Sequence, residues 1–298
     1  MNELNKAQKL MLFHHKPVNQ LAVKRTAKIL KQIGLYLLLF IGAAIMLVPF
    51  LWMLSTSLKT GQYVLTMPPQ FFPKPLTIDS YKRIFELYPM GRMLLNSLIV
   101  AILTTLGQLI TSSMAAYAFA RMHFRGRDTI FLIYLATLMV PFQVTITPLF
   151  ILMRIFGWVN TYQALILPGI FSAFGTFMLR QSFMTIPVDY EESAILEGAS
   201  PFVVFSRIIL PLSTPTLATL AVFAFMSSWN SFLWPLFAVS DMEMMTLPLG
   251  LATLKGRWIT EWNLMMAGTV ISVIPMMLVF LFAQRYFIKG FVMSGLKG

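Results

Sequence analysis

The sequence predicts an all-α, polytopic membrane protein with six transmembrane helices. The chain of 298 residues is 57% hydrophobic and only 11% charged, far from the average composition of soluble domains. Six stretches without Asp, Glu, Lys or Arg each reach the length of about 20 residues that a helix needs to cross a hydrocarbon core. Six buried helices of a soluble protein would leave too little polar chain to coat the core. The six charge-free windows are residues 32–58, 93–120, 129–153, 155–179, 208–240 and 262–284.

The basic residues predict the orientation of these helices. Lys and Arg near helix ends stay on the cytoplasmic side, and an even number of spans places both termini on one side. With cytoplasmic N and C termini, 15 of the 23 Lys and Arg lie inside, which also accounts for much of the net charge of +12 without a nucleic-acid partner. These are Lys6, Lys9, Lys16, Lys24, Arg25, Lys28, Lys31, Arg121, Arg125, Arg127, Arg180, Arg207, Arg285, Lys289 and Lys297.

Three regions are expected along the chain. Residues 1–33 form a basic cytoplasmic N-terminal extension, residues 34–290 form the six-helix domain with a cytoplasmic loop at 187–211, and residues 291–298 form a cytoplasmic tail. The first window is longer than the apolar core of a signal peptide, so we expect a spanning helix that is retained.

The sequence indicates no catalytic, cofactor-binding or metal site. There is no cysteine to act as a nucleophile or metal ligand, and no G-x-x-x-x-G-K-[ST] phosphate loop. The three histidines lie in segments expected in the cytoplasm and have no acidic partner three or four residues further along. We therefore expect that the chain is not an enzyme, and that any ATPase activity driving it belongs to another chain.

The windows carry uncharged polar groups in place of ionisable ones. A secondary carrier coupled to an ion, or an enzyme within the membrane, would need an ionisable group at depth. The polar groups suit hydrogen bonds to a hydroxylated solute, or they join neighbouring helices. The solute reading is favoured around Asn230, where tryptophans flank an amide. The candidate pathway residues are Gln143, Thr145, Trp229, Asn230 and Trp234, and other polar groups at depth are Gln108, Thr111 to Ser113, Thr147, Ser227, Ser228 and Ser231.

Prolines are expected to bend several of the spans. A proline inside a helix removes one hydrogen bond and frees a carbonyl. Five of the windows contain such residues, namely Pro49, Pro141, Pro148, Pro168, Pro235 and Pro275.

The loop 187–211 predicts two short helices joined by a sharp turn. Asp189 is a suitable N-cap, and Glu192 follows at the spacing of a capping box. The charges of Glu191 and Glu192 suit a helix start, and Gly198 supplies a left-handed stop.

The second helix of this loop is expected to begin at Ser200, with Pro201 at its first position, and to end at Pro211. Ala194 and Ala199 keep the turn slim. Two readings stay open on physical grounds: the acidic residues only cap the helix and turn the chain, or the hairpin is an acidic knob that docks into a basic groove.

The same loop resembles a motif of ABC importer permeases. That motif reads E-A-A-x-x-x-G-x9-I-x-L-P, and this chain has Glu192-Ser-Ala-Ile-Leu-Glu-Gly198, nine residues, then Ile208-Ile-Leu210-Pro211. It departs from the usual pattern at Ser193 and Glu197. Residues 116–127, 179–187 and 228–235 are similar to the carbohydrate-uptake branch, and within it to the maltose-type second permease.

This resemblance implies the type I ABC importer permease fold in a bacterial or archaeal inner membrane. It implies four kinds of partner: two ATP-binding subunits, which would bind ATP and Mg²⁺, a second permease, an extracytoplasmic solute-binding protein and a sugar. No cofactor would be bound by this chain. The solute would be a di- or oligosaccharide or a glycosylated polyol, with glycerol phosphate as an alternative. The residues expected to couple to the ATPase are Glu191, Glu192, Ala194, Glu197, Gly198, Ala199 and Pro211.

Overall fold

The computed structural model describes residues 18–254 and 260–295, with side chains from 28 to 254 and from 260 to 284. Every regular element in these residues is helical, which confirms the all-α prediction. The chain divides into two units, Met1–Ser55 and Thr56–Gly298, which are described separately. Much of the predicted extension and the end of the predicted tail lie outside the described residues.

The helices follow one another with short connections. The longer α-helices are α2 (Val18–Ser57), α3 (Asp79–Leu87), α4 (Met90–Arg121), α5 (Arg127–Ala136), α6 (Phe142–Ile155), α8 (Ala173–Met184), α9 (Asp189–Leu196), α12 (Thr214–Trp229) and α15 (Trp262–Gly295). The shorter ones are α7 (Tyr162–Ile166), α10 (Pro201–Val204), α11 (Leu210–Leu212), α13 (Leu233–Ala238) and α14 (Leu247–Thr253). Four 3₁₀ turns, η1 (Gly61–Tyr63), η2 (Thr137–Met139), η3 (Leu167–Gly169) and η5 (Met242–Met244), and one π-helical turn, η4 (Phe205–Ile209), complete the described elements.

The first unit consists mainly of α2, a helix that is apolar on all of its faces. Large apolar side chains from Ile29 to Leu54 are exposed around the helix. A helix without a polar face is suited to lipid or to a covering of other helices. Within the described residues, Lys28–Ser57 is therefore one of three continuous helices long and apolar enough to cross a membrane; the other two are Met90–Arg121 and Trp262–Gln284.

The other three windows are bent, as the prolines in the sequence predict. Each is a pair of helices bent at a short break: Arg127–Met139 and Phe142–Ile155 by 100°, Tyr162–Gly169 and Ala173–Met184 by 41°, and Pro201–Leu212 and Thr214–Trp229 by 79°. Proline lies at or near each break, with Pro141 just before α6, Pro168 within η3 and Pro215 in the first turn of α12. Proline starts a helix easily and disfavours the helical conformation of the residue before it.

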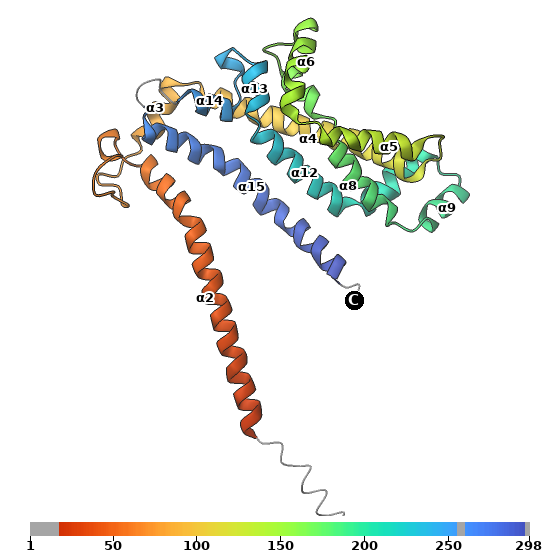
Figure 1. The fold of residues 1–298 in the computed structure, drawn as a ribbon, viewed down its shortest axis with the longest axis horizontal. Coiled ribbons are helices and arrows are strands. Elements are labelled where there is room, and N and C mark those ends of the chain that lie inside the picture. The colour runs from red at the N-terminus through yellow and green to blue at the C-terminus, as the bar shows by residue number, and fades with distance from the viewer. Residues whose placement is uncertain (1–17, 255–259, 296–298) are drawn as a thin grey trace, which may run out of the picture. The chain divides into compact units, whose positions relative to one another are not determined.

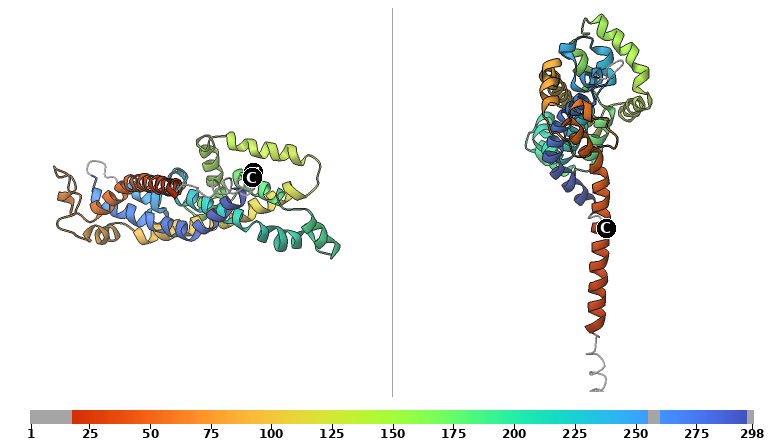
Figure 2. Two further views of the ribbon diagram at one scale, coloured as in Figure 1. Left: turned by 90° about the horizontal axis from the view of Figure 1, so that it is seen from below. Right: turned by 90° about the vertical axis from the view of Figure 1, so that its left-hand side faces the viewer.

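Helix α4 is the central element of the second unit. It packs along its length against α8 and α12, and α12 packs in turn against α15 (Figure 1). Three buried apolar clusters hold the unit together, and α4 contributes to each, through Met93, Val100 and Ala116 respectively. Helices α3 and α9 lie at opposite ends of the unit, as both Figure 1 and the left view of Figure 2 show.

Close helix packing in this unit depends on small residues. At Gly175 of α8, a Cβ atom would lie 2.8 Å from the hydroxyl oxygen of Ser112 on α4 and 3.1 Å from a methyl group of Leu220 on α12. Three helices therefore meet where one of them has no side chain, an arrangement common in helical membrane proteins.

We expect Gly175→Ala to lower the melting temperature of the purified protein in detergent. The added methyl group must push the three helices apart, a change that costs about 1–3 kcal/mol in packed cores. The control is Gly91→Ala in α4, where a Cβ atom would have no neighbour within 4 Å. A melting temperature of Gly175→Ala equal to that of Gly91→Ala would contradict the close packing.

Candidate functional site

The candidate site begins with the helical hairpin of α9 and α10, at the end of the second unit opposite α3. Helix α9 ends at Leu196, and Gly198 has a left-handed backbone with φ +87°. The amide of Gly198 donates to the carbonyl of Ile195, and that of Ala199 to the carbonyl of Ala194, both at 2.9 Å. This pair of bonds is a Schellman motif, so the predicted glycine stop is confirmed.

The start of α9 differs from the prediction. Asp189 is the first residue of the helix rather than its N-cap; the cap position is Val188, which makes no side-chain cap. Val188 has helical backbone angles and its carbonyl accepts from Glu191 and Glu192, so the helix starts one residue earlier than a side-chain cap at Asp189 would require. The acidic first turn still suits the positive end of the helix dipole.

Helix α10 begins as the sequence predicts. The hydroxyl oxygen of Ser200 accepts from the amide of Val203 at 3.4 Å, and Pro201 occupies the first helical position. The predicted end at Pro211 is wrong, because the helical path continues through η4 and α11 to Leu212. Pro211 has no amide hydrogen to donate, and the widened π turn lies directly before it, a common way to accommodate a local fault in the helical hydrogen bonds.

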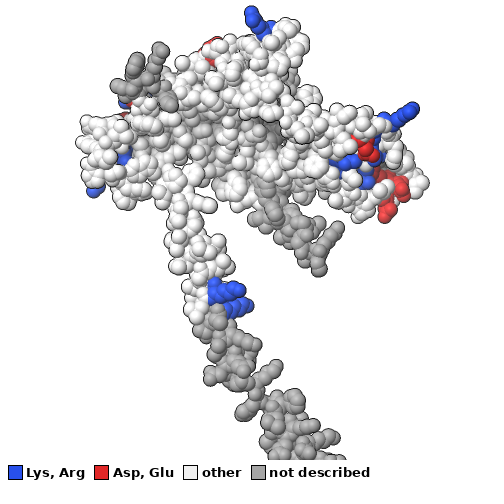
Figure 3. All heavy atoms as spheres, viewed as in Figure 1, with Lys and Arg blue, Asp and Glu red and all other residues white. Residues whose placement is uncertain are grey.

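The hairpin exposes its acidic residues and buries its small ones. Asp189, Glu192, Glu197 and Gly198 are exposed, and Ala194 and Ala199 are half-buried against the apolar cluster that α4, α8 and α12 share. Figure 3 shows acidic atoms gathered at this end, beside basic ones, while most of the surface between the two ends of the unit is uncharged, apart from a few charged atoms at its upper edge.

Glu191 is the exception among the acidic residues of the hairpin, because it points inward. Its carboxylate oxygen Oε1 lies 2.7 Å from Nε of Arg121, the last residue of α4, and both side chains are nearly buried, at 9% and 10% exposure. Burial raises the pKa of the Glu191 carboxyl above its usual range, and the charge of Arg121 opposes that shift. Glu191 therefore attaches the hairpin to the helical unit, a contact that the sequence analysis missed.

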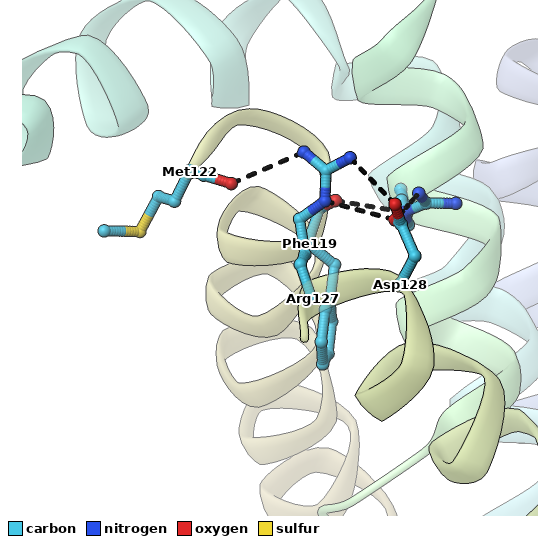
Figure 4. A network of polar contacts seen from close by, with 5 residues as sticks. Phe119, Met122, Arg127 and Asp128 are labelled. Carbon is cyan, nitrogen blue, oxygen red and sulfur yellow. Dashed lines mark hydrogen bonds and ion pairs between the residues drawn. The ribbon is translucent and has the colours of Figure 1, made fainter. Parts of the chain in front are cut away.

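A second group of charges ties α4, α5 and α8 together at the same end (Figure 4). Arg127 donates to both carboxylate oxygens of Asp128, at 3.1 and 3.3 Å, and to the carbonyl of Met122 at 3.5 Å. Arg180 of α8 donates to the carbonyl of Phe119 at 3.1 Å, contacts Asp128 at 3.4 Å and lies 4.2 Å from the ring centroid of Phe131.

A hollow of about 320 Å³, lined by apolar and uncharged polar residues, lies between α4, η3, α12 and α13. Two of the residues that line it, Thr104 and Thr246, have buried hydroxyl groups with no hydrogen-bond partner among the described residues. The lining residues are Val100, Thr104, Gln108, Phe142, Leu165, Pro168, Gly169, Ala224, Ser227, Ser228, Ser231, Trp234, Pro235 and Thr246.

Of the five candidate pathway residues, Trp234 alone lines this hollow. Trp229 is buried against Phe225, with its indole nitrogen donating to the carbonyl of Ser272 at 3.2 Å. Asn230 is exposed, and its amide donates back to the carbonyl of Met226 at 2.8 Å. These contacts give Trp229 and Asn230 the partners of ordinary structural residues.

The remaining two candidates lie in the first turn of α6, away from the hollow. Gln143 is exposed, and Thr145 donates to the carbonyl of Phe142 at 2.8 Å. The polar residues that the sequence placed at depth, Gln108, Ser227, Ser228 and Ser231, are the ones that the fold brings together. Thr104 and Thr246 gave no sequence signal, because their neighbours across the hollow are far apart in the chain.

The described residues contain no group of three or more His, Asp or Glu side chains that could hold a metal ion. The site thus offers two parts, a hairpin with an acidic outer face and an uncharged hollow of mixed polar and apolar lining.

Known proteins resemble this chain over most of its length. The family described as "Binding-protein-dependent transport system inner membrane component" matches residues 108–292. The arabinooligosaccharides transport system permease protein AraQ of Halalkalibacterium halodurans is 39% identical over 229 residues, 76% of this chain and 82% of that protein. The sn-glycerol-3-phosphate transport system permease protein UgpE of Pectobacterium atrosepticum is 39% identical over 208 residues, 69% of this chain and 74% of that protein.

The fold also matches a solved structure, a chain of a bacterial ABC transporter involved in the import of the acidic polysaccharide alginate. The TM-score is 0.76 at 24% identity, covering 88% of this chain and 98% of that chain. This likeness extends to nearly the whole of the other chain and shows that the two share a fold.

We expect Gly198→Val to loosen the hairpin and Gly198→Asn to preserve it. The two side chains are similar in size, and a Cβ atom at this position has no neighbour within 4 Å, so crowding does not separate them. Asn tolerates the left-handed conformation, whereas a β-branched residue is strained there by about 1–3 kcal/mol. Hydrogen exchange of the α9 amides measures the difference; equal exchange in the two variants would show that φ at this position is not what holds the turn.

Proposed function

Since the chain belongs to the family of binding-protein-dependent transport system inner membrane components, we propose that it is a permease subunit of an ATP-driven importer. The loop 187–211 predicted a family of importer permeases, and the family match confirms that prediction. The observation that carries the proposal is the exposed acidic hairpin at one end of a helical unit whose long segments are apolar.

The proposed topology has six spans, with both termini in the cytoplasm of a bacterial inner membrane. Three spans would be continuous helices and three would be the bent pairs. The hairpin and the basic segment around Arg125 then lie inside, in accord with the preference of Lys and Arg for the cytoplasmic side.

The proposed partners are two ATP-binding subunits, a second permease and an extracytoplasmic solute-binding protein. ATP and Mg²⁺ would bind to the ATP-binding subunits, with no cofactor on this chain. Glu192 and Glu197 would face a basic groove of one ATP-binding subunit, with Gly198 and Ala199 allowing close approach. Closure of those subunits on ATP would then move the hairpin and drive alternating access.

The proposed solute is a neutral carbohydrate, such as a di- or oligosaccharide or a glycosylated polyol. The hollow is lined by hydroxyl, amide and apolar groups, and none of its lining residues is charged. A phosphate ester would gain most from Arg or Lys, so glycerol phosphate, the solute in the name of one relative, is the weaker alternative. The hydroxyl groups of Thr104 and Thr246 are buried without a partner among the described residues, and a solute hydroxyl would pair with them once a movement of the helices exposes them.

We expect Glu192→Lys to abolish transport and to release the ATP-binding subunit during purification, because it reverses a charge on the docking face. The exposed side chain makes the fold itself insensitive to the change. Glu86→Lys, on the exposed side of α3 at the other end of the unit, is the control. Retention of the ATPase and of uptake by Glu192→Lys would remove the docking role.

We expect Thr104→Val to weaken solute uptake about two- to tenfold, the loss of one neutral hydrogen bond, without lowering the melting temperature. The substitution removes a hydroxyl group that has no protein partner in the described residues and keeps its shape. Thr105→Val is the matched control: Thr105 is also buried, but its hydroxyl donates to the carbonyl of Ala101 at 2.6 Å.

Transport kinetics in proteoliposomes measure this difference, with purified importer and a panel of sugars. A loss of uptake in Gln143→Leu together with normal uptake in Thr104→Val would move the pathway from the hollow to the exposed face of α6.

A further inference from the structure

The contact between Arg121 and Glu191 joins three helices at one guanidinium group. Nε of Arg121 pairs with Glu191 of α9 at 2.7 Å. Nη2 donates to the carbonyl of Phe183, in the last turn of α8, at 2.7 Å and to that of Ile186, two residues beyond the helix, at 2.5 Å. Arg121 is itself the last residue of α4. One side chain therefore connects the ends of α4 and α8 with the first turn of α9.

This joint, formed by the contacts of Arg121 with Glu191 and with the two carbonyls, is stabilised by its chemistry. Carbonyls at a helix C-terminus have no partner within the helix and carry a partial negative charge, so a cation there is stabilised. A guanidinium group offers several donors in a fixed plane and can serve a carboxylate and two carbonyls together. Because both side chains are nearly buried, removing either one leaves a buried charge without its partner, a strongly unfavourable state.

We infer that Arg121 and Glu191 are positioning residues that transmit movement of the hairpin to α4 and α8. The inference rests on the proposed function, in which an ATP-binding subunit moves the hairpin. It adds the route by which that movement would reach the membrane, and it gives two adjacent glutamates of the hairpin opposite tasks. Glu192 faces outward to the partner, and Glu191 faces inward to the helices.

The route through this joint leads directly to the hollow. Thr104 and Gln108 of α4 line the hollow, and Arg121 lies 13 residues beyond Gln108 on the same continuous helix. At a rise of 1.5 Å per residue this is roughly 20 Å. A displacement at Arg121 is therefore carried to the hollow by one unbroken helix.

The alternative route along the chain is less direct. From α9 the backbone passes through the Gly198 turn, the π-helical turn η4 and the break before α12, where the helices bend by 79°. π turns and helix breaks are points where a helix yields. The ion pair bypasses all three of them.

The test compares Glu191→Gln with Asp128→Asn in the complete importer, reconstituted in proteoliposomes with its ATP-binding subunits, second permease and binding protein. Both variants remove a carboxylate charge from an ion pair at the same end, but the side chain of Asp128 is 66% exposed. We expect the ratio of solute imported to ATP hydrolysed to fall about five- to tenfold in Glu191→Gln. In Asp128→Asn, this ratio should stay within about twofold of the wild-type value. An unchanged ratio in Glu191→Gln complexes that retain the ATPase overturns the inference.

A rescue experiment separates transmission from simple stabilisation. The chain has no cysteine, so in Arg121→Cys/Glu191→Cys a cleavable bifunctional thiol reagent joins only these two positions when the partner subunits lack cysteine. We expect the ratio of import to ATP hydrolysis to be low before cross-linking, to rise on cross-linking and to fall again on cleavage. A ratio that does not respond to the link overturns the inference.

Failure of the proposed function gives a different pattern. If purification of the wild-type permease from cells that express its candidate partners recovers no ATP-binding subunit with it, the importer assignment fails. The joint is then tested alone, by hydrogen exchange of the α9 amides in the purified permease. Exchange in Glu191→Gln should be faster than in wild type, and equal exchange would show that the pair does not hold the hairpin.

Discussion

The free-energy cost of a charge in hydrocarbon decides where this chain can hold its ionisable groups. Its helical segments are free of charge over long windows, and the charged side chains collect where those windows end. There they pair with one another and with the carbonyls at helix ends, as Arg121 does with Glu191 and with the end of α8. The constraint that keeps charge out of these windows therefore also supplies the contacts that fasten the hairpin to the helices.

Between those charged ends, the helices are held by shape. Lipid provides little hydrophobic force to bring apolar helices together, so packing of small residues must do so. Helix α4 meets α8 and α12 where Gly175 allows close approach, and it contributes to all three apolar clusters. A movement of one end of α4 is for this reason shared by the helices packed along it.

Structural features that depend on neighbouring residues were predicted well from the sequence, whereas contacts between distant residues were not. The all-helical fold, the Gly198 stop and the Ser200 cap each depend on residues close in the chain. The bends were expected from proline, but their angles depend on packing between distant segments. Arg121 and Glu191 pair although they are 70 positions apart in the chain. In the sequence, an arginine at the end of a helix indicates only the orientation of that helix and not the partner of the side chain. The sequence placed Trp229 beside Asn230 and so suggested a role in sugar stacking. Its contacts with Phe225 and Ser272 are set by the fold and could not be read from the sequence.

The requirements of stability and of function agree at the ion pair of the hairpin and conflict at the hollow. The buried ion pair of Arg121 and Glu191 satisfies groups that would be costly if left alone, so selection for a stable hairpin and for a firm connection act in the same direction. The hydroxyl groups of Thr104 and Thr246 are buried without a partner in the described part of the chain, and valine would fill the same space at lower cost. Buried polar groups that have no hydrogen-bond partner within the protein are expected where function requires them. The hollow is therefore where we propose that a solute, rather than the fold, determines the residues.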